Sequence, residues 1–444
     1  MNRLVERVRI LRPLRHRDFR LLWIGMTASL IGDGIFIVSL AWQVYQLSNA
    51  PTALSIVGVA MTVPQIVFLL LGGVVSDRFD RRRVMIAADA LRALSLIALG
   101  LLSIAPEGTL QIWHVMIVAA VFGAGTAFFG PAFDAIVPQL VPSRDLNQAN
   151  SLDQFVRPAA ARMLGPAVGG WLIAAWGPGT AFLIDASTFV VSIACVALMR
   201  ARAVDETEER RSAFHDIREG FRFVRSRVWL WGTFLAATLA YLIFWGPSEV
   251  LLPFIVKNHM HGSPSDLGFI LALGGVGAMF AAFVMGNREM PSRHITFMYG
   301  VWTISTVAIA GYGLASFPWQ LMVASFVFNA LEGAGTIVWA TTKGRLVPAR
   351  LLGRVSSFDW FISTGLVPVS FALTGPVAAI FGPRTTLVGA GILGGVVTLG
   401  FLFLPGMRDV ERSGDLARAS AEDPDRPLPP IEEPLLPSRA PAPL

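Results

Sequence analysis

Twelve long apolar stretches, separated by short polar breaks, occupy most of the chain as far as Pro405. About 20 apolar residues are enough for a helix to cross the hydrocarbon core of a bilayer, and each stretch has at least that length. The stretches are residues 19–47, 52–75, 84–104, 111–137, 151–175, 179–200, 228–256, 265–287, 294–315, 318–342, 356–381 and 385–405. The pattern therefore predicts an all-α membrane protein with twelve transmembrane helices.

A repeat divides these stretches into two groups of six. The segment from Leu140 to Phe155 aligns without a gap to the segment from Leu346 to Phe361, and eight of the 16 positions are identical at an offset of 206 residues. Each copy lies between the fourth and the fifth stretch of its half. Such a repeat is typical of transporters built from two parallel bundles. We therefore expect an N-terminal six-helix bundle at residues 1–200 and a C-terminal one at residues 228–406.

Two segments fall outside these bundles. Residues 201–227 predict a cytoplasmic linker with an amphipathic helix on the membrane surface, because apolar residues recur among arginines at intervals of three and four. These apolar residues are Phe214, Ile217, Phe221 and Val224. Residues 407–444 are polar and rich in proline, which predicts a disordered cytoplasmic tail.

Composition and charge place the chain in a membrane. Hydrophobic residues make up 54% of the 444 residues and charged residues only 15%, which excludes an ordinary water-soluble protein. If both termini are cytoplasmic, 31 of the 36 Lys and Arg fall inside, and the outer connectors hold only Lys257 and Arg384. Because positive residues gather on the cytoplasmic side, we expect a multi-pass protein of the bacterial inner (cytoplasmic) membrane with both termini inside. Most of the arginines lie in the connectors on the cytoplasmic side. The net charge of +6 therefore does not indicate nucleic acid as a partner.

A compact charged run, GVVSDRFDRRR at residues 73–83, joins the second and third stretches. It resembles the signature Gly-x-x-x-Asp-Arg-x-Gly-Arg-Arg of the major facilitator superfamily, and Asp80 stands where that family has glycine. We expect Asp77 to accept hydrogen bonds from the first N–H groups of the following helix. A positively charged anchor that only sets topology is the alternative interpretation. The matching residues are Gly73, Asp77, Arg78, Arg81 and Arg82.

The resemblance implies that this signature braces the N-terminal half against helix 11 when the carrier faces outward. Other charged residues near the inner surface share a helix face because they are three or four residues apart. We expect them to gate the inner mouth rather than to contact substrate. They are Asp89 with Arg92, Asp153 with Arg157, and Asp359 at the start of helix 11, acting together with Asp77 and Arg81.

Charged side chains inside apolar stretches are costly and therefore need a reason. With a rise of 1.5 Å per residue, Asp33, Glu332 and Arg162 fall near the midplane, whereas Glu249 and Asp185 fall toward the outer ends of their helices. Apolar surroundings favour the neutral form of a carboxylate and entering water favours its ionised form, as proton coupling requires. We expect Asp33 first, and Glu332 second, to carry the proton. The alternative is a structural carboxylate that is paired with Arg162 or bonded to a nearby hydroxyl.

Helix 5 contains Gly165-Pro166-Ala-Val-Gly169-Gly170. Small residues four apart allow close helix approach, and the proline bends the axis. The run resembles the antiporter signature Gly-x-x-x-Gly-Pro-x-x-Gly-Gly of exporters in the superfamily, with Ala161 at the first glycine. Further phrases are similar to the proton-coupled multidrug exporters of the branch that includes macrolide, tetracycline and enterobactin exporters. These phrases are residues 14–20, 130–132, 140–150 and 220–227.

A cavity that accepts many substrates needs a broad aromatic surface. The candidates for it are Trp42, Phe128, Phe129, Trp245, Glu249 and Trp339. The chain has no Gly-x-x-x-x-Gly-Lys-Ser/Thr loop for ATP, no spaced ligand cluster for a metal and no nucleophile arrangement. We therefore expect no cofactor, no metal and no enzymatic activity.

These observations favour a secondary active transporter that exports small amphipathic or hydrophobic compounds, such as drugs and antibiotics, in exchange for protons. We expect a monomer whose partners are its small-molecule substrate, protons and the lipid bilayer. Three alternatives remain open. They are a siderophore or metabolite exporter, an importer or uniporter of the same fold, and a carrier-fold receptor or lipid scramblase that does not transport.

Overall fold

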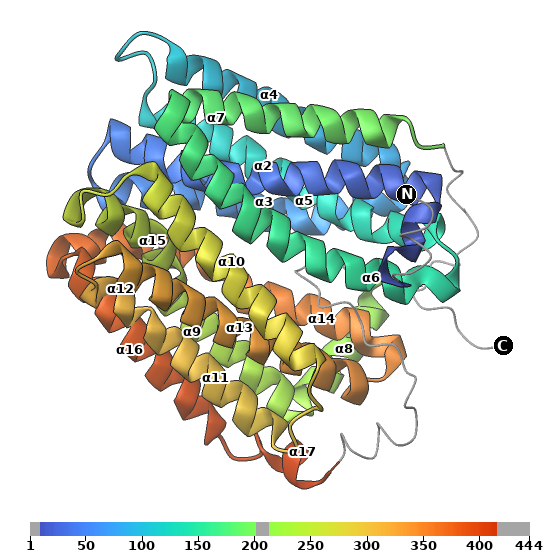
Figure 1. Cartoon of the computed structure of the whole chain (residues 1–444). Coiled ribbons are helices and arrows are strands. Elements are labelled where there is room, and N and C mark those ends of the chain that lie inside the picture. The colour runs from blue at the N-terminus through green and yellow to red at the C-terminus, as the bar shows by residue number, and fades with distance from the viewer. Residues whose placement is uncertain (1–8, 201–212, 415–444) are drawn as a thin grey trace.

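The structure, a computed structural model (Figure 1), describes residues 9–200 and 213–414. Helices account for most of these residues, and no strand occurs within the two ranges. Eleven helical segments there are long and apolar enough to cross a membrane. The predicted all-α membrane class is therefore confirmed.

The described helices follow one another with short connections. Those before the linker are η1 (Arg9–Arg15), α2 (Arg17–Leu47), α3 (Pro51–Arg78), α4 (Arg81–Ile104), α5 (Ile112–Leu140), α6 (Ser143–Arg157), the π-helical η2 (Pro158–Leu164) and α7 (Gly165–Ala197). Those from the linker onward are α8 (Ala213–Arg225), α9 (Val228–Phe254), the π-helical η3 (Ile255–His259), α10 (Pro264–Gly286), α11 (His294–Ala308), α12 (Ala310–Leu314), α13 (Pro318–Leu346), α14 (Ala349–Thr364), α15 (Val367–Phe381), α16 (Pro383–Leu402) and α17 (Asp409–Arg412).

Helix α7 is sharply bent in its middle. Gly177 has φ 80° and ψ 166°, a backbone conformation that favours glycine, and Pro178 follows it. The apolar segment from Phe155 to Ala197 is 43 residues long, whereas a single crossing needs only about 20. Figure 1 shows α7 doubling back on itself. We call the parts before and after Gly177 the first and second limbs.

The helices form two sets that diverge toward one end of the molecule. Helices α2 to α7 pack on one another and form the first half, and helices α9 to α16 form the second half. In Figure 1 the first half is blue to green and the second is yellow-green to red. The halves meet mainly where α7 contacts α10 and where α3 contacts α15. We call the end at which η1, α8 and α17 lie the linker end, and the opposite end the loop end.

Three clusters of buried apolar side chains stabilise this arrangement. One cluster draws on both halves toward the loop end and includes Tyr45 and Val250. The other two lie toward the linker end, one around Met85 in the first half and one around Phe234 in the second. The apolar core is therefore continuous between the halves at the loop end and divided at the linker end.

Polar contacts join the two halves at the loop end. The Tyr45 hydroxyl donates to the carbonyl oxygen of Val250 at 2.6 Å. Lys257 Nζ donates to the carbonyl oxygen of Tyr45 and, at 3.1 Å, to Asn49 Oδ1. Helices α2 and α9 both end near these residues, so these loop-end contacts hold the two halves together there.

The turn between α3 and α4 is shorter than the charged run suggests. Helix α3 continues to Arg78 and α4 begins at Arg81, so Asp77 lies within α3. Asp80 caps α4, since its Oδ1 accepts a hydrogen bond from the backbone N–H of Arg82 at 3.0 Å. Asp80 is therefore the cap that the structure shows, and the hydrogen bonds predicted for Asp77 lie outside the described side chains and stay a prediction. The residue that departs from the family signature is the one that supplies the cap.

Arg81 and Arg82 tie the start of α4 to its neighbours in the first half. Arg81 Nη1 donates to the carbonyl of Ala135 in α5 at 3.1 Å. Arg82 Nη2 donates at 2.7 Å to the carbonyl of Ala197, which has no partner within α7 because it ends that helix. The bracing of this signature against helix 11 stays a prediction. Three residues of the signature lie outside the set whose surroundings the structure describes. They are Gly73, Asp77 and Arg78.

The linker contains helix α8, which packs against the second half. Val224 is buried, and Glu219 Oε2 lies 3.0 Å from Arg354 Nη1 of α14. Residues 201–212 and 415–444 lie outside the described residues. The extent of the linker and the predicted disorder of the tail therefore stay predictions.

Candidate functional site

Asp33 lies halfway along α2, between two glycines that let α7 approach closely. A Cβ atom at Gly34 would lie 2.7 Å from the Cα atom of Gly165 in the first limb, and one at Gly32 would collide with the carboxylate of Asp185 in the second limb. Any side chain at either position would force these neighbours apart. The Gly-Asp-Gly sequence therefore places Asp33 where both limbs of α7 meet α2.

Arg92 of α4 is a cation beside Asp33. Its Nη1 atom lies 3.8 Å from Asp33 Oδ1, and its Nη2 atom donates to Oδ1 of Asp89, which precedes it by three residues on α4. Side-chain exposure separates these groups: it is 29% for Asp33, 3% for Arg92 and 0% for Asp89. Asp33 is thus the accessible member, and Asp89 and Arg92 form a buried pair behind it.

Three phenylalanine rings surround the Arg92 guanidinium. Its Cζ atom lies 4.5 Å from the ring centre of Phe189, 4.8 Å from that of Phe129 and 5.9 Å from that of Phe122. A Cβ atom at Gly125 would lie 2.7 Å from Arg92 Cγ, so glycine there leaves room for the aliphatic part of the side chain. A cation over an aromatic face gains about 0.5–2 kcal/mol. The rings also displace water, which makes the guanidinium depend on its carboxylate partners.

Asp185 supplies a third carboxylate to this group. Its side chain is fully buried and interacts electrostatically with Asp33 and Arg92. The Thr188 hydroxyl lies 3.4 Å from Asp185 Oδ1, whereas Oδ2 has no hydrogen-bond partner in the described part of the chain. Three carboxylates from three helices therefore face one guanidinium. We call Asp33, Asp89, Arg92 and Asp185 the charge cluster.

This cluster is suited to binding and releasing protons. Three ionised carboxylates beside one guanidinium leave excess negative charge among packed helices and aromatic rings, and proton uptake by a carboxylate relieves that excess. Asp33 is the accessible member, so it is the group that can exchange a proton with entering water. Within the described residues, no group of three or more His, Cys, Asp or Glu side chains is arranged to hold a metal ion.

The positions of Asp89 and Arg92 correct the sequence-based expectation. Their spacing predicts a pair at the inner gate, but the structure buries them inside the first half beside Asp33. Helix α4 begins at Arg81, so its third and fourth turns already lie within the packed bundle. We therefore interpret this pair as part of the charge cluster.

Arg162, the predicted charge partner of Asp33, lies in the π-helical turn η2 beside the second half. Its backbone packs against Gly275 of α10. It interacts electrostatically with Glu249 and Tyr241 of α9. Arg162 and Glu249 are both exposed. Arg162 therefore links a π-helical turn of the first half to a carboxylate of the second, and its predicted pairing with Asp33 stays a prediction.

The glycines of helix 5 lie at two helix contacts. A Cβ atom at Gly169 would lie 2.9 Å from the backbone of α2, close to the contact made by Gly165. Gly170 faces the other half, where its Cβ atom would lie 3.0 Å from the Cα atom of Gly268 in α10. Pro166 follows the π-helical turn and lacks the N–H that would continue helical bonding. This motif therefore joins the helix of Asp33 to the second half.

Glu332, the second candidate for proton coupling, lies in α13 of the second half. Its Oε1 accepts from the Thr336 hydroxyl at 3.0 Å, and its carbonyl oxygen accepts from Trp302 Nε1 at 3.3 Å. The side chain is half-buried and interacts electrostatically with Tyr241. The roles predicted for Asp33 and Glu332 both stay predictions.

Two carboxylates at corresponding places of the repeat have different partners. Asp153 of the first half lies 3.3 Å from Arg157 on the same helix, and both side chains are about a quarter exposed, at 23% and 24%. In the second half, Asp359 Oδ2 accepts from Lys343 Nζ at 2.9 Å and from Trp339 Nε1 at 2.7 Å. Lys343 and Asp359 are only 9% and 13% exposed. The pair in the second half is therefore the more deeply buried of the two.

Two of the predicted cavity residues belong instead to the apolar cores. Trp42 and Trp339 are 8% and 7% exposed and lie in the shared cluster and the second-half cluster, respectively. Their large apolar rings contribute more to stability when buried between helices than when exposed. The remaining candidates for the substrate cavity are Phe128, Phe129, Trp245 and Glu249.

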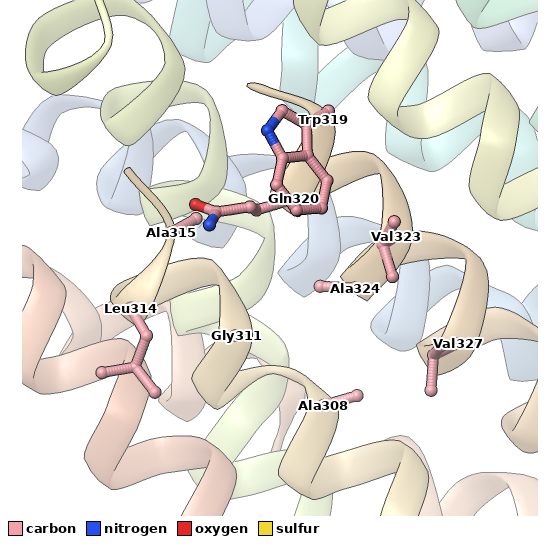
Figure 2. A pocket seen from close by; sticks show the side chains of 9 residues that line it. All are labelled: Ala308, Gly311, Leu314, Ala315, Trp319, Gln320, Val323, Ala324 and Val327. Atoms are coloured by element: carbon pink, nitrogen blue, oxygen red, sulfur yellow. The ribbon is translucent and has the colours of Figure 1, made fainter. Parts of the chain in front are cut away.

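A pocket of about 380 Å³ opens between α12 and α13 near the loop end (Figure 2). Its lining is mostly apolar, and Leu314 and Trp319 are exposed there. Its one polar side chain, Gln320, already accepts hydrogen bonds from the backbone N–H groups of Ser316 and Phe317. None of the predicted site residues lines this pocket, so we do not assign substrate binding to it.

Comparison with known proteins gives a family. A sequence model of the transmembrane secretion effector family (MFS_3) matches residues 9–429. The chain is 29% identical over 416 residues to the multidrug efflux pump Tap of Mycolicibacterium fortuitum, covering 88% of this chain and 96% of Tap. It is 25% identical over 390 residues to macrolide efflux protein A of Streptococcus pyogenes, covering 81% of this chain and 95% of that protein.

A solved structure has the same fold at low sequence identity. It is that of a bacterial homologue of the iron transporter ferroportin in an inward-facing state, with a TM-score of 0.68 and 14% identity, covering 88% of this chain and 99% of that chain. This likeness shows the fold, while the family model matches nearly the whole sequence. The chain therefore belongs to the transmembrane secretion effector family of the major facilitator superfamily, whose members are transporters rather than enzymes.

Proposed function

We propose that the chain is a proton-coupled exporter of small amphipathic or hydrophobic compounds that works by alternating access. The observation that carries the proposal is Asp33, an accessible carboxylate halfway along a membrane helix with a buried guanidinium 3.8 Å away. The names of two relatives, a multidrug efflux pump and a macrolide efflux protein, support export as the direction.

Proton occupancy of Asp33 would change the packing around it. An ionised Asp33 attracts Arg92 and so draws α2 toward α4, whereas a protonated Asp33 leaves Arg92 to Asp89. The glycines beside Asp33 contact both limbs of α7, and the first limb contacts α10 in the other half. A proton can therefore bias the arrangement of the two halves through differential contacts in the two states.

We place the linker end in the cytoplasm, because the connectors there carry most of the Lys and Arg residues. The divided core then corresponds to an inward-facing arrangement, and the loop-end contacts close the outer side. The reversal at Gly177 supports counting α7 as two crossings, which makes twelve in total. The domains are then the bundles at residues 1–200 and 228–406, with the linker at 201–227 and the tail at 407–444, in a monomer.

Transport by the purified full-length protein in proteoliposomes tests this proposal. Two probes are suitable, the macrolide erythromycin and the fluorescent amphipathic dye ethidium. An imposed pH gradient should drive each probe from the linker-end side to the loop-end side, with protons moving in the opposite direction. Asp33→Asn should abolish proton movement. Glu107→Gln removes an exposed carboxylate at the loop end and is the matched control, which should behave as wild type.

Each alternative function has its own outcome in this assay. Unchanged coupling in Asp33→Asn would remove Asp33 from the mechanism. Accumulation in the opposite direction would identify an importer, and probe movement without protons a uniporter. Movement of labelled lipid without any probe transport would identify a scramblase.

A further inference from the structure

Asp185 is buried more deeply than the carboxylate that exchanges protons with water. It is 0% exposed in the second limb of α7, and its Oδ2 has no hydrogen-bond partner in the described part of the chain. Its Oδ1 lies 3.4 Å from the Thr188 hydroxyl. An ionised carboxylate is strongly disfavoured in such a place, because one of its oxygens is removed from water without gaining a hydrogen bond. A protonated carboxyl avoids most of that penalty.

The charged groups that face Asp185 come from both helices that pack on this limb. Helix α2 contributes Asp33, and α4 contributes Arg92 with its partner Asp89. Helix α10 packs against the other limb. Arg92 already donates a hydrogen bond to Asp89 and lies 3.8 Å from Asp33. One guanidinium cannot neutralise three carboxylates, so at least one of them has to hold a proton.

We propose that Asp185 is a second proton-binding residue of the transport cycle and that it exchanges a proton with Asp33 inside the first half. Asp33 is accessible, and Gly32 beside it leaves the Asp185 carboxylate in contact with α2. In the transfer the O–H bond of Asp33 breaks and an O–H bond forms at the carboxylate of Asp185. Asp33 then becomes the ionised partner of Arg92, and the reverse transfer restores the first state. No other reagent takes part.

This relay lies within one half of the protein. Its members belong to α2, α4 and α7, which pack together, so rocking of the halves does not separate them. A proton on Asp185 is therefore shielded from both sides of the membrane while the halves move between the inward-facing and outward-facing arrangements. The inference rests on the proposed proton coupling and adds the residue that stores the proton.

Infrared spectroscopy of the purified protein during a pH titration tests the inference without any substrate. A protonated carboxyl gives a C=O stretching band that is separate from carboxylate bands. Over the titration the wild type should show two such bands, one from Asp185 and one from Asp33, which appear at different pH values because the two carboxylates share the first proton. Asp185→Asn should lose one of them, Asp33→Asn should lose the other, and Glu107→Gln should lose neither. A spectrum of Asp185→Asn that retains both bands overturns the proposal.

A second variant keeps the test decisive if Asp185→Asn does not fold. Thr188→Val keeps the shape of the side chain and removes the hydroxyl beside Asp185, so it should shift one carboxyl band without abolishing it. A Thr188→Val spectrum identical to that of the wild type also overturns the proposal. In vesicles, Asp185→Asn should move fewer protons per ethidium than the wild type. If the wild type moves ethidium without protons, the proposed function fails, while the infrared bands still report on Asp185 itself.

Discussion

The two halves share a repeated topology but differ in where they keep their charges. In the first half, helices α2, α4 and α7 bring three carboxylates and an arginine together inside the bundle. The corresponding helices of the second half are α9, α11 and, for the two limbs of α7, α15 and α16. Their only Asp, Glu, Lys or Arg residues are Glu249 and Arg384. Glu249 is exposed and interacts with Arg162 of the first half.

This difference shows that a symmetric architecture can carry asymmetric chemistry. Buried charges need compensation from neighbouring helices, and the first half provides it through close glycine contacts and phenylalanine rings. The second half keeps its ion pair, Lys343 with Asp359, near the linker end. The proposed mechanism places proton binding by Asp33 in the first half, and the role predicted for Glu332 of the second half stays a prediction.

Removal of Arg92 should give the largest loss of stability. Arg92→Met leaves three carboxylates without their guanidinium, and losing one partner of a buried pair costs about 3–5 kcal/mol. Thermal unfolding of the purified protein in detergent should show a large drop in the midpoint. Arg354→Met removes a more exposed pair with Glu219 and is the control, with little expected change. Equal midpoints for the two variants would contradict the burial argument.

The glycines beside the two candidate proton carriers, Gly34 and Gly333, provide a second test of the difference between the halves. Gly34→Ala would push a Cβ atom into Gly165 and Pro166, and such overpacking costs about 1–3 kcal/mol. At Gly333, next to Glu332, the nearest atom to an added Cβ is 3.4 Å away, so Gly333→Ala should be tolerated. Unfolding midpoints and ethidium transport measure both variants. A Gly333→Ala protein as impaired as Gly34→Ala would remove the distinction.

Removing the cation from each ion pair of the repeat should give a smaller difference in stability. Lys343→Met leaves Asp359 with the Trp339 and Ser363 side chains as its donors but without its cation in a nearly buried place, which should cost roughly 1–2 kcal/mol. Arg157→Met breaks the more exposed pair with Asp153 and should cost less than about 1 kcal/mol. Chemical denaturation of the two variants gives this ranking directly, and the opposite ranking would contradict it.

The loop-end contacts should have the smallest effect. Lys257→Met removes one cation that joins the halves, which is worth less than about 1 kcal/mol. The fold should be unchanged, but the halves should separate more often at the loop end. Spin labels at the exposed positions Glu107 and Ser316 would report this as a longer distance population. An unchanged distance distribution would mean that the shared apolar core alone closes this end.

The sequence predicted the helical membrane class and the positions of most helices, because apolar length is a property of each segment by itself. It also indicated that Asp33 lies in the middle of its helix. It missed the link from Asp33 to Arg92 and Asp185, because depth along a helix does not tell which neighbouring helix it faces. The one available signal was the pair of glycines around Asp33, which indicates close packing on two sides.

Local chemistry was not enough to predict the cap of α4 or the position of two tryptophans. Asp80, the residue that departs from the family signature, caps α4, and the sequence analysis did not single it out for that role. Trp42 and Trp339 are aromatic residues in membrane helices, and composition alone cannot separate a residue that lines a cavity from one that fills a core. Only the packing of helices from distant parts of the chain distinguishes these roles.

The divided core has a consequence for selectivity. In the proposed alternating-access cycle, the protein has to separate the apolar surfaces that are joined at the loop end. Water that enters there disfavours the motion in proportion to the apolar area uncovered. An apolar cargo molecule lying between the halves covers part of that area. On the proposed mechanism, such a cargo lowers the barrier to its own passage through its apolar area, with little dependence on its shape.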